Sequence, residues 1–338
     1  MTRTDIRLAL PSKGVLQKES LTLLEECGLT VKKTNPRQYK ATIPEMSGVT
    51  VLFQRPSDIA VGVREGSIDF GITGLDIITE KGNTSGQESI LIIHEALGFG
   101  PCTLNLAVPE DLPIHTMSDL QNWAQELAEK ETPLRIATKF PRTTGKFLDE
   151  HNIAPYKLID AEGTLEIAPD IGFADIISDL VSSGTTLRDN HLRPLDGGLI
   201  LESQAALIAN KAALQTRPKV RAVAKQLLEY IEAHLRALGS YLVITNMRGD
   251  SPESIATLMK KRPFISGLQG PTIANIVSPD GHDNKLFSVT IVVAKRELVK
   301  AIAELRAIGG SGVIVTPISY IFEEEPERYK AMLAALEN

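Results

Sequence analysis

The regular alternation of short apolar segments with amphipathic ones constrains the fold of this chain more than any other feature. Apolar runs of strand length occupy 6–10, 49–53 and 69–72, and segments 16–27 and 57–65 between them have helical spacing. Strands and helices that alternate along a chain pack as layers around a largely parallel sheet. The sequence therefore predicts an α/β fold.

One strand-and-turn pattern occurs twice. Residues 65–76 can be laid beside residues 172–183, and this aligns Asp69 with Asp175. Each copy has a glycine shortly before an acid-led apolar strand, and each ends in a turn rich in Thr, Ser or Gly. Two α/β lobes with a cleft between them would produce this repetition, with the carboxyl end of each strand facing the other lobe. We expect lobe I to comprise 1–103 and 203–238 and lobe II to comprise 104–202, with the chain crossing near 98–101.

The pattern changes from residue 241 onward. The remaining segments read as strand, helix, two strands, helix and strand, at 241–246, 252–261, 272–278, 286–293, 295–307 and 312–316. This βαββαβ order is that of ferredoxin-like folds. We predict a separate third domain over 239–338.

Composition excludes several classes of partner. A chain of 338 residues is too long for one ordinary core, and 43% hydrophobic with 23% charged residues is typical of a globular protein. A formal net charge of −6 gives no general attraction for nucleic acid, and no apolar run is long enough to span a bilayer. We expect a cytoplasmic protein with neither nucleic acid nor membrane as a partner. Cys27 and Cys102 lack metal-ligand spacing, so buried free thiols are predicted.

The segment 175–187 carries the strongest functional signal. An apolar strand bearing Asp175 and Asp179 is followed by five small or hydroxyl residues, Ser182 to Thr186. Such a turn exposes N–H groups and hydroxyls that suit an anion, whereas a carboxylate just upstream suits ribose hydroxyls or a metal that rides on pyrophosphate. The pattern favours a pocket for a phosphorylated sugar, although an ordinary Ser/Thr-capped helix would read similarly.

Segment 174–192, Ala-Asp-Ile-Ile-Ser-Asp-Leu-Val-Ser-Ser-Gly-Thr-Thr-Leu-Arg-Asp-Asn-His-Leu, resembles the signature of the ATP phosphoribosyltransferase family. Further segments resemble other landmarks of the family's long form in the same order, namely 8–14, 55–59, 69–76, 162–169, 270–274 and 307–315. The resemblance covers nearly the whole chain.

The resemblance implies a catalytic unit with the two-lobed fold of type II periplasmic binding proteins, followed by an ACT-like βαββαβ regulatory domain. It implies the first step of histidine biosynthesis. In that step N1 of ATP attacks C1′ of phosphoribosyl pyrophosphate (PRPP) and expels pyrophosphate, with Mg²⁺ as cofactor. Histidine is the implied effector, a dimer or hexamer the implied assembly, and Gly270, Thr272 and Ile273 are the implied effector contacts. A non-catalytic phosphometabolite sensor on the same scaffold is the rival hypothesis.

Carried onto this sequence, the family's sites predict where PRPP binds. We assign its 5′-phosphate to Ser182, Ser183, Gly184, Thr185 and Thr186, with Leu187 fixing the turn. Asp179 would hold the ribose hydroxyls. Asp175 joins it if the strand alternates regularly, and otherwise it is a surface acid at the start of a strand. No residues are assigned to the metal.

ATP and pyrophosphate are expected at a second set of positions: Lys13, Gly14, Arg55, Thr73, Gly74, Asp76 and Glu166. We expect Lys13, Arg55 and Asp179 to matter most for catalysis, because aligning two polyanions calls for positioning and charge rather than a strong base. Taken alone, Lys13 and Arg55 would read as exposed loop cations. Glu166 contacts either ribose or metal, or else it is solvated.

Two departures from the family pattern affect the expected phosphate contacts. The family usually has Arg where this chain has Val15, and an Arg-Arg pair where it has Gly145 and Lys146. Each change removes a guanidinium that could bind phosphate through two hydrogen bonds. Either Lys139, Arg142 and Lys146 compensate or nucleotide binding is weaker, and these three could equally form a solvated loop.

Overall fold

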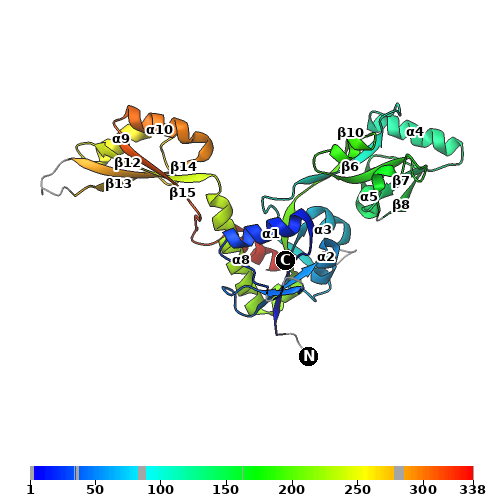
Figure 1. Cartoon of the computed structure of the whole chain (residues 1–338), viewed down its shortest axis with the longest axis horizontal. Coiled ribbons are helices and arrows are strands. Elements are labelled where there is room, and N and C mark those ends of the chain that lie inside the picture. The colour runs from blue at the N-terminus through cyan, green and yellow to red at the C-terminus, as the bar shows by residue number, and fades with distance from the viewer. Residues whose placement is uncertain are drawn as a thin grey trace. The chain divides into compact units, whose positions relative to one another are not determined.

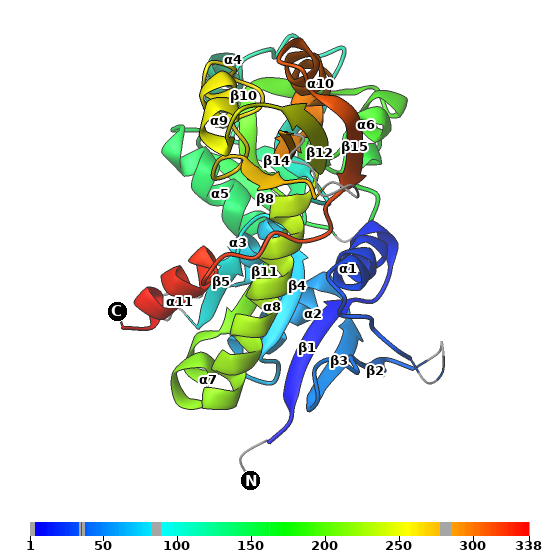
Figure 2. The same ribbon diagram turned by 90° about the vertical axis from the view of Figure 1, so that its left-hand side faces the viewer.

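A computed structural model of the chain describes residues 4–33, 35, 38–82, 89–161, 163–277 and 285–337. The chain divides into two compact units, which are drawn in Figures 1 and 2. The first comprises Met1–Leu228 with Glu327–Asn338, and the second comprises Glu229–Pro326.

The described residues of lobe I form a sheet of six strands. In their order across the sheet they are β2 (Lys40–Thr42), β3 (Val49–Gln54), β1 (Ile6–Pro11), β4 (Phe70–Gly74), β11 (Ala205–Asn210) and β5 (Ile90–His94). Strand β1 runs parallel to β3 and β4, whereas β11 is antiparallel to β4 and β5. The helices are α1 (Gly14–Glu26), α2 (Pro56–Arg64), α3 (Leu75–Lys81), α7 (Lys211–Thr216) and the part of α8 (Pro218–Ala237) up to Leu228.

Lobe II repeats this arrangement with five strands among the described residues. Their order is β10 (Leu192–Ser203), β6 (Cys102–Pro109), β9 (Ile176–Val181), β7 (Leu134–Thr138) and β8 (Tyr156–Asp160). Strand β7 is parallel to β8 and β9, and β6 is antiparallel to β9. The remaining elements are α4 (Met117–Glu129), α5 (Pro141–Glu150), the short 3₁₀ turn η1 (Leu165–Ile167) and α6 (Thr185–Asp189). The two-lobed α/β architecture is therefore as predicted.

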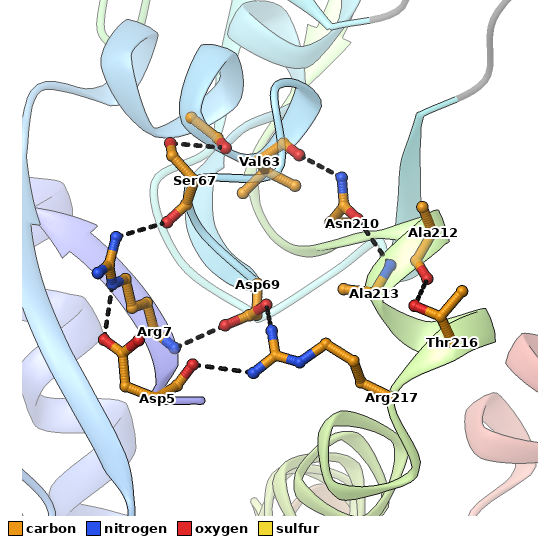
Figure 3. Close-up of polar contacts among 11 residues, drawn as sticks. Asp5, Arg7, Val63, Ser67, Asp69, Asn210, Ala212, Ala213, Thr216 and Arg217 are labelled. Atoms are coloured by element: carbon orange, nitrogen blue, oxygen red, sulfur yellow. Dashed lines mark hydrogen bonds and ion pairs between the residues drawn. The ribbon is translucent and has the colours of Figure 1, made fainter. Parts of the chain in front are cut away.

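The predicted equivalence of Asp69 and Asp175 is confirmed by their contacts. Each lies just before the strand that continues the parallel set, and each accepts a hydrogen bond from a neighbouring backbone amide, that of Arg7 (2.8 Å) and that of Arg135 (2.7 Å). Each also pairs with a guanidinium. Asp69 bonds Arg217 at 2.6 Å, as Figure 3 shows, and Asp175 bonds Arg135 at 2.7 Å. The two lobes thus share one strand-start motif.

The chain returns from lobe II to lobe I at Gln204, which lies between β10 of the lobe II sheet and β11 of the lobe I sheet. The predicted lobe limits of 103/104 and 202/203 fall inside β6 and β10.

The second unit has the predicted βαββαβ order. It contains β12 (Ser240–Arg248), α9 (Pro252–Lys260), β13 (Thr272–Asn275), β14 (Leu286–Ala294), the 3₁₀ turn η2 (Lys295–Glu297), α10 (Leu298–Ala307) and β15 (Ser311–Pro317). The antiparallel sheet has the order β13-β14-β12-β15. Its core joins Val243 and Val289 of the sheet to Ile255 of α9 and Leu305 of α10. The strand predicted over 272–278 ends at Asn275, and its residue 278 lies outside the described residues.

The C-terminal helix α11 (Glu327–Glu337) does not belong to this second unit, although the predicted domain ran from 239 to 338. It packs against β5 and α7 of the first unit. Arg328 forms two hydrogen bonds with Glu95, at 2.6 and 3.0 Å, and Met332 is buried. Residues about 230 positions apart in sequence meet here, which a local sequence pattern cannot predict.

Candidate functional site

The turn that follows β9 presents a row of hydroxyl groups. Gly184 adopts φ +72°, a left-handed conformation that favours glycine, and α6 begins directly after it. The side chains of Ser182, Ser183, Thr185 and Thr186 are exposed. Ser183 Oγ donates to Thr185 Oγ1 at 3.1 Å.

The buried side chain of Leu187 anchors this turn to the core of lobe II. It is 5% exposed and packs in a small core with Ile177 of β9 and Leu192 of β10. An apolar anchor beneath exposed polar groups holds the hydroxyls of the turn at the carboxyl end of β9. The residues predicted from Ser182 to Leu187 therefore lie together.

Asp179 lies near this turn, half-buried in β9. Its Oδ1 accepts a hydrogen bond from the Leu180 amide at 2.8 Å. Burial raises the pKa of Asp179, the Leu180 amide and the Lys139 ammonium oppose the rise, and the Glu166 carboxylate adds to it. Lys139 and Glu166 thus lie close enough to act electrostatically on Asp179.

Asp175 lies at the other end of β9. Asp179 lies four positions further along the chain, about 13 Å away at 3.3 Å per residue. Its carboxylate is occupied by the amide and guanidinium of Arg135. A pocket of about 820 Å³ opens at this end, lined by Asp175, Arg135 and Trp123 among others, and Glu166 also borders it. Asp175 therefore does not lie with the turn.

A smaller pocket of about 500 Å³ adjoins the turn where the chain crosses between lobes. Its walls comprise Val181 and Ser182 of lobe II together with 101–103 and 202–204 of the two crossing segments. Cys102 lines it and is half-buried rather than buried as predicted, whereas Cys27 is buried. Burial, reinforced by the Asp76 carboxylate, raises the pKa of the Cys102 thiol, so it is held in its protonated form.

The predicted ATP residues of lobe I gather at one edge of its sheet. Lys13 and Gly14 follow β1, Arg55 follows β3, and Thr73 and Gly74 end β4. Because these three strands are parallel, their carboxyl ends share an edge. The side chains of Lys13 and Arg55 are exposed. Thr73 is buried, and its hydroxyl donates to the Pro56 carbonyl at 3.2 Å.

Asp76 is engaged by a residue that the sequence did not indicate. It is 5% exposed, and its Oδ1 accepts from Ser203 Oγ at 2.6 Å, while its amide donates to the same oxygen at 3.0 Å. Burial raises the pKa of Asp76, and the bond from Ser203 opposes this. A Cβ at Gly74 would lie 2.1 Å from Asp76 Oδ1, so any side chain there would displace the Asp76 carboxylate from Ser203. The Asp76–Ser203 pair ties the start of α3 to the end of β10.

Glu80 is a second buried acid that sequence reasoning missed. It lies one helical turn after Asp76 on α3 and is 6% exposed. Its carboxylate accepts from the amides of Arg142 and Thr143 and from Thr143 Oγ1. No local motif marks this contact, because two of its three donors are backbone groups of a distant helix.

The positions that depart from the family pattern have distinct surroundings. Val15 is 66% exposed. Gly145 lies inside α5 against Tyr156 and Leu158, and a Cβ there would approach them to 3.4 and 3.3 Å. The neighbouring Lys146 is exposed and pairs with Glu150 at 3.8 Å. Of the three candidate compensating cations, Lys139 is the one that acts on Asp179.

The described residues hold no built metal site, and the predicted effector residues lie in the second unit. Among the described residues there is no cluster of three or more His, Cys, Asp or Glu side chains able to hold a metal. In the second unit, Thr272 and Ile273 begin β13, and Gly270 before them has φ +104°. Gly267 lies close behind, where a Cβ would stand 2.9 Å from the Gly270 carbonyl oxygen. The predicted effector residues thus lie on and beside an edge strand.

The fold defines a class: a two-lobed α/β protein joined to a βαββαβ domain, with exposed polar side chains at the carboxyl ends of its parallel strands. Residues 55–233 match the family described as ATP phosphoribosyltransferase, and residues 237–320 match the HisG C-terminal domain. The sequence is 45% identical to "ATP phosphoribosyltransferase 2, chloroplastic" of Arabidopsis thaliana, over 99% of this chain and 81% of that protein. It is 36% identical to the ATP phosphoribosyltransferase of Methanothermobacter thermautotrophicus, over 94% and 99%.

A solved structure agrees with these sequence matches. A chain of the "ATP phosphoribosyl transferase (HisG:HisZ) complex from Thermotoga maritima" superposes with a TM-score of 0.50 at 25% identity, covering 67% of this chain and 98% of that one. The chain belongs to the ATP phosphoribosyltransferase family, and its two-domain extent corresponds to the long form. Its activity is the transfer of a phosphoribosyl group from PRPP to ATP in histidine biosynthesis. None of the helices in the described part of the chain has the length and apolar character needed to cross a membrane.

Proposed function

We propose that the turn Ser182–Leu187 binds the 5′-phosphate of PRPP and that Asp179 binds its ribose hydroxyls. The observation that carries this proposal is the exposed hydroxyl turn, which is anchored by buried Leu187 and adjoins a pocket of about 500 Å³. Neutral N–H and O–H donors suit phosphate, and a half-buried carboxylate suits a diol. Asp175 is omitted because Arg135 occupies its carboxylate.

ATP and the departing pyrophosphate bind, on this proposal, at the lobe I edge. Lys13 and Arg55 supply positive charge to the phosphates, and the backbone of Gly14 and Thr73–Gly74 approaches them closely. Asp76 contributes by holding the Gly74 turn through its bond to Ser203. Two polyanions are thereby brought to facing edges with cations on one side and neutral donors on the other.

The chemistry follows from the nucleophile. N1 of adenine already has a lone pair, so no residue is needed to remove a proton from it. The barrier lies in aligning N1 with C1′ and in stabilising the charge on the leaving group, and positioning and electrostatics address both. Asp179 would also stabilise positive charge that develops at the ribose ring in the transition state.

Mg²⁺ is the cofactor we propose for the leaving group. Mg²⁺ usually binds through substrate phosphates with one or two carboxylates and needs no larger set of protein ligands. Glu166 and Asp179, which interact electrostatically, would hold it. When bound it supplies charge neutralisation to pyrophosphate.

For the second unit we propose feedback inhibition by histidine at Gly270, Thr272 and Ile273. Exposed Thr272 and the backbone of an edge strand could bind an amino acid's charged ends through hydrogen bonds. A homo-oligomer, a dimer or hexamer, is the assembly we propose. The expected cytoplasmic location stays a prediction, since two Arabidopsis relatives are named as chloroplastic.

The PRPP assignment is tested by removing hydroxyls from the turn. Replacing Ser183→Ala and Thr185→Val together should weaken PRPP binding, measured by titration calorimetry, by about tenfold or more, at roughly 1 kcal/mol per lost hydrogen bond. Thr132→Val, an exposed threonine elsewhere in lobe II, is the matched control. Unchanged PRPP affinity in the double variant would remove the phosphate from this turn.

A further inference from the structure

Helix α5 begins without a capping side chain of its own. Its N-cap residue is Phe140, which makes no side-chain hydrogen bond to the helix, and Pro141 is its first residue. The first amides of any helix need partners from outside the helix. Here Glu80 accepts from the Arg142 amide at 3.0 Å, the Thr143 amide at 2.9 Å and Thr143 Oγ1 at 2.7 Å.

This cap comes from the other lobe. Glu80 belongs to α3, which follows β4 of the lobe I sheet, whereas α5 follows β7 of the lobe II sheet. Among the described residues, the Asp76–Ser203 pair is a second side-chain contact that joins the two lobes. Hydrogen bonds to a buried carboxylate are among the stronger ones in proteins, and their loss leaves helix amides without partners.

Each of the two helices joined by Glu80 is also connected to a proposed substrate site. On the lobe I side, α3 starts at the Gly74 turn, and Asp76 in its first turn bonds Ser203. On the lobe II side, Lys139 lies just before α5 and acts on Asp179. Within α5, Thr144 Oγ1 lies 2.8 Å from Ser178 Oγ, the residue before Asp179 in β9.

We propose that Glu80 is a positioning residue for the transferase reaction. It joins α3 to α5. This contact would hold the proposed ATP site of lobe I and the proposed PRPP site of lobe II at a fixed distance from each other. It touches neither substrate and acts through α5 and Lys139. The inference rests on the proposed placement of the two substrates, because only then does the contact link both.

The expected effect follows from the geometry of the reaction. N1 and C1′ react only when held close and aligned, so lobes that vary in separation spend less time in the competent arrangement. An apparent affinity falls in proportion to the competent fraction. Loss of the Glu80 contact should therefore raise the KM values of ATP and PRPP together, whereas kcat, measured with both substrates bound, changes less.

Two variants of the full chain test this, with one matched control. Glu80→Ala removes all three hydrogen bonds, and we expect both KM values to rise about tenfold with kcat within about threefold. Glu80→Gln keeps one acceptor oxygen, so its KM values should lie between those of the parent protein and those of Glu80→Ala. The control is Asp119→Ala, which removes a comparable cap from α4, where Asp119 accepts from the Thr116 and His115 amides at 2.8 and 3.0 Å within lobe II.

A distance measurement gives a readout that does not involve substrate. Spin labels at the exposed positions 65 in lobe I and 129 in lobe II should report a broader distance distribution in Glu80→Ala than in Asp119→Ala. Equal distributions and equal kinetics in these two variants would overturn the proposal, because a purely structural cap would affect both alike. If Glu80→Ala does not fold, Glu80→Gln carries the same comparison. A misplaced substrate site would instead leave the broadening intact and leave both KM values unchanged.

Discussion

Replacing Asp179 with Asn tests the proposed ribose site with little change in shape. Asn has nearly the same volume as Asp but carries no charge. Oδ1 of Asp179 already accepts from the Leu180 amide, so Oδ2 is the oxygen that the proposal assigns to the ribose hydroxyls. A hydrogen bond to a charged group contributes about 1.5–3 kcal/mol. At about 1.4 kcal/mol per factor of ten, kcat/KM for PRPP should fall about ten- to 150-fold.

The stability of the Asp179→Asn variant should not fall with its activity. Burial raises the pKa of Asp179 above its ordinary value, so the folded protein binds the proton more tightly than the unfolded chain does. This group therefore favours folding most at low pH and less as pH rises through its folded pKa. Removing the charge at neutral pH should leave the melting temperature unchanged or higher, which separates lost function from misfolding.

The assay follows the ultraviolet absorbance of the product while PRPP is varied at saturating ATP and Mg²⁺. Asp189→Asn is the control, since Asp189 is an exposed acid of α6, close in sequence to the same turn. An Asp179→Asn variant with the kinetics of the parent protein would refute the placement of PRPP. So would an equal loss in Asp189→Asn.

Three further outcomes are expected. Asp69→Asn should lower the free energy of unfolding by about 3 kcal/mol in urea titrations, because it leaves the half-buried Arg217 without its charge partner; the more exposed Asp175–Arg135 pair should cost less, and an equal cost would contradict the reasoning. Burial, aided by the Arg328 cation, lowers the pKa of His94 to about 4, so stability should decline as pH falls from about 6.5 toward 4. His94→Gln should flatten that decline, and an unaltered pH profile would speak against it. Chelation by EDTA should abolish turnover, with recovery on adding Mg²⁺, while the melting temperature stays within about 1 °C; a large fall in melting temperature would reveal a structural metal instead.

Much of the fold was predictable because its signals are local. Helix α4 begins at Met117 directly after a capping box formed by Thr116 and Asp119, two residues at the spacing that marks a helix start in sequence. The duplicated acid at Asp69 and Asp175 was visible because each begins a strand after a glycine turn. Both acids proved to be strand-start anchors with guanidinium partners, and the sequence cannot show which acid meets a distant arginine.

The parts that sequence reasoning missed depend on contacts between distant segments. Ser203 reaches Asp76 across 127 positions, and Glu80 reaches α5 across 62. Helix α11 carries its own amphipathic pattern, but nothing in that pattern indicates that it packs on β5. Side-chain chemistry was therefore easier to predict than the partners of each side chain.

The most direct test of the account is a crystal structure of the protein with PRPP bound. The account predicts phosphate oxygens within hydrogen-bond distance of Ser183 and Thr185, and ribose hydroxyls on Asp179. Finding the sugar phosphate in the pocket of Arg135 and Asp175 instead, with the 182–187 turn left in contact with solvent, would contradict it.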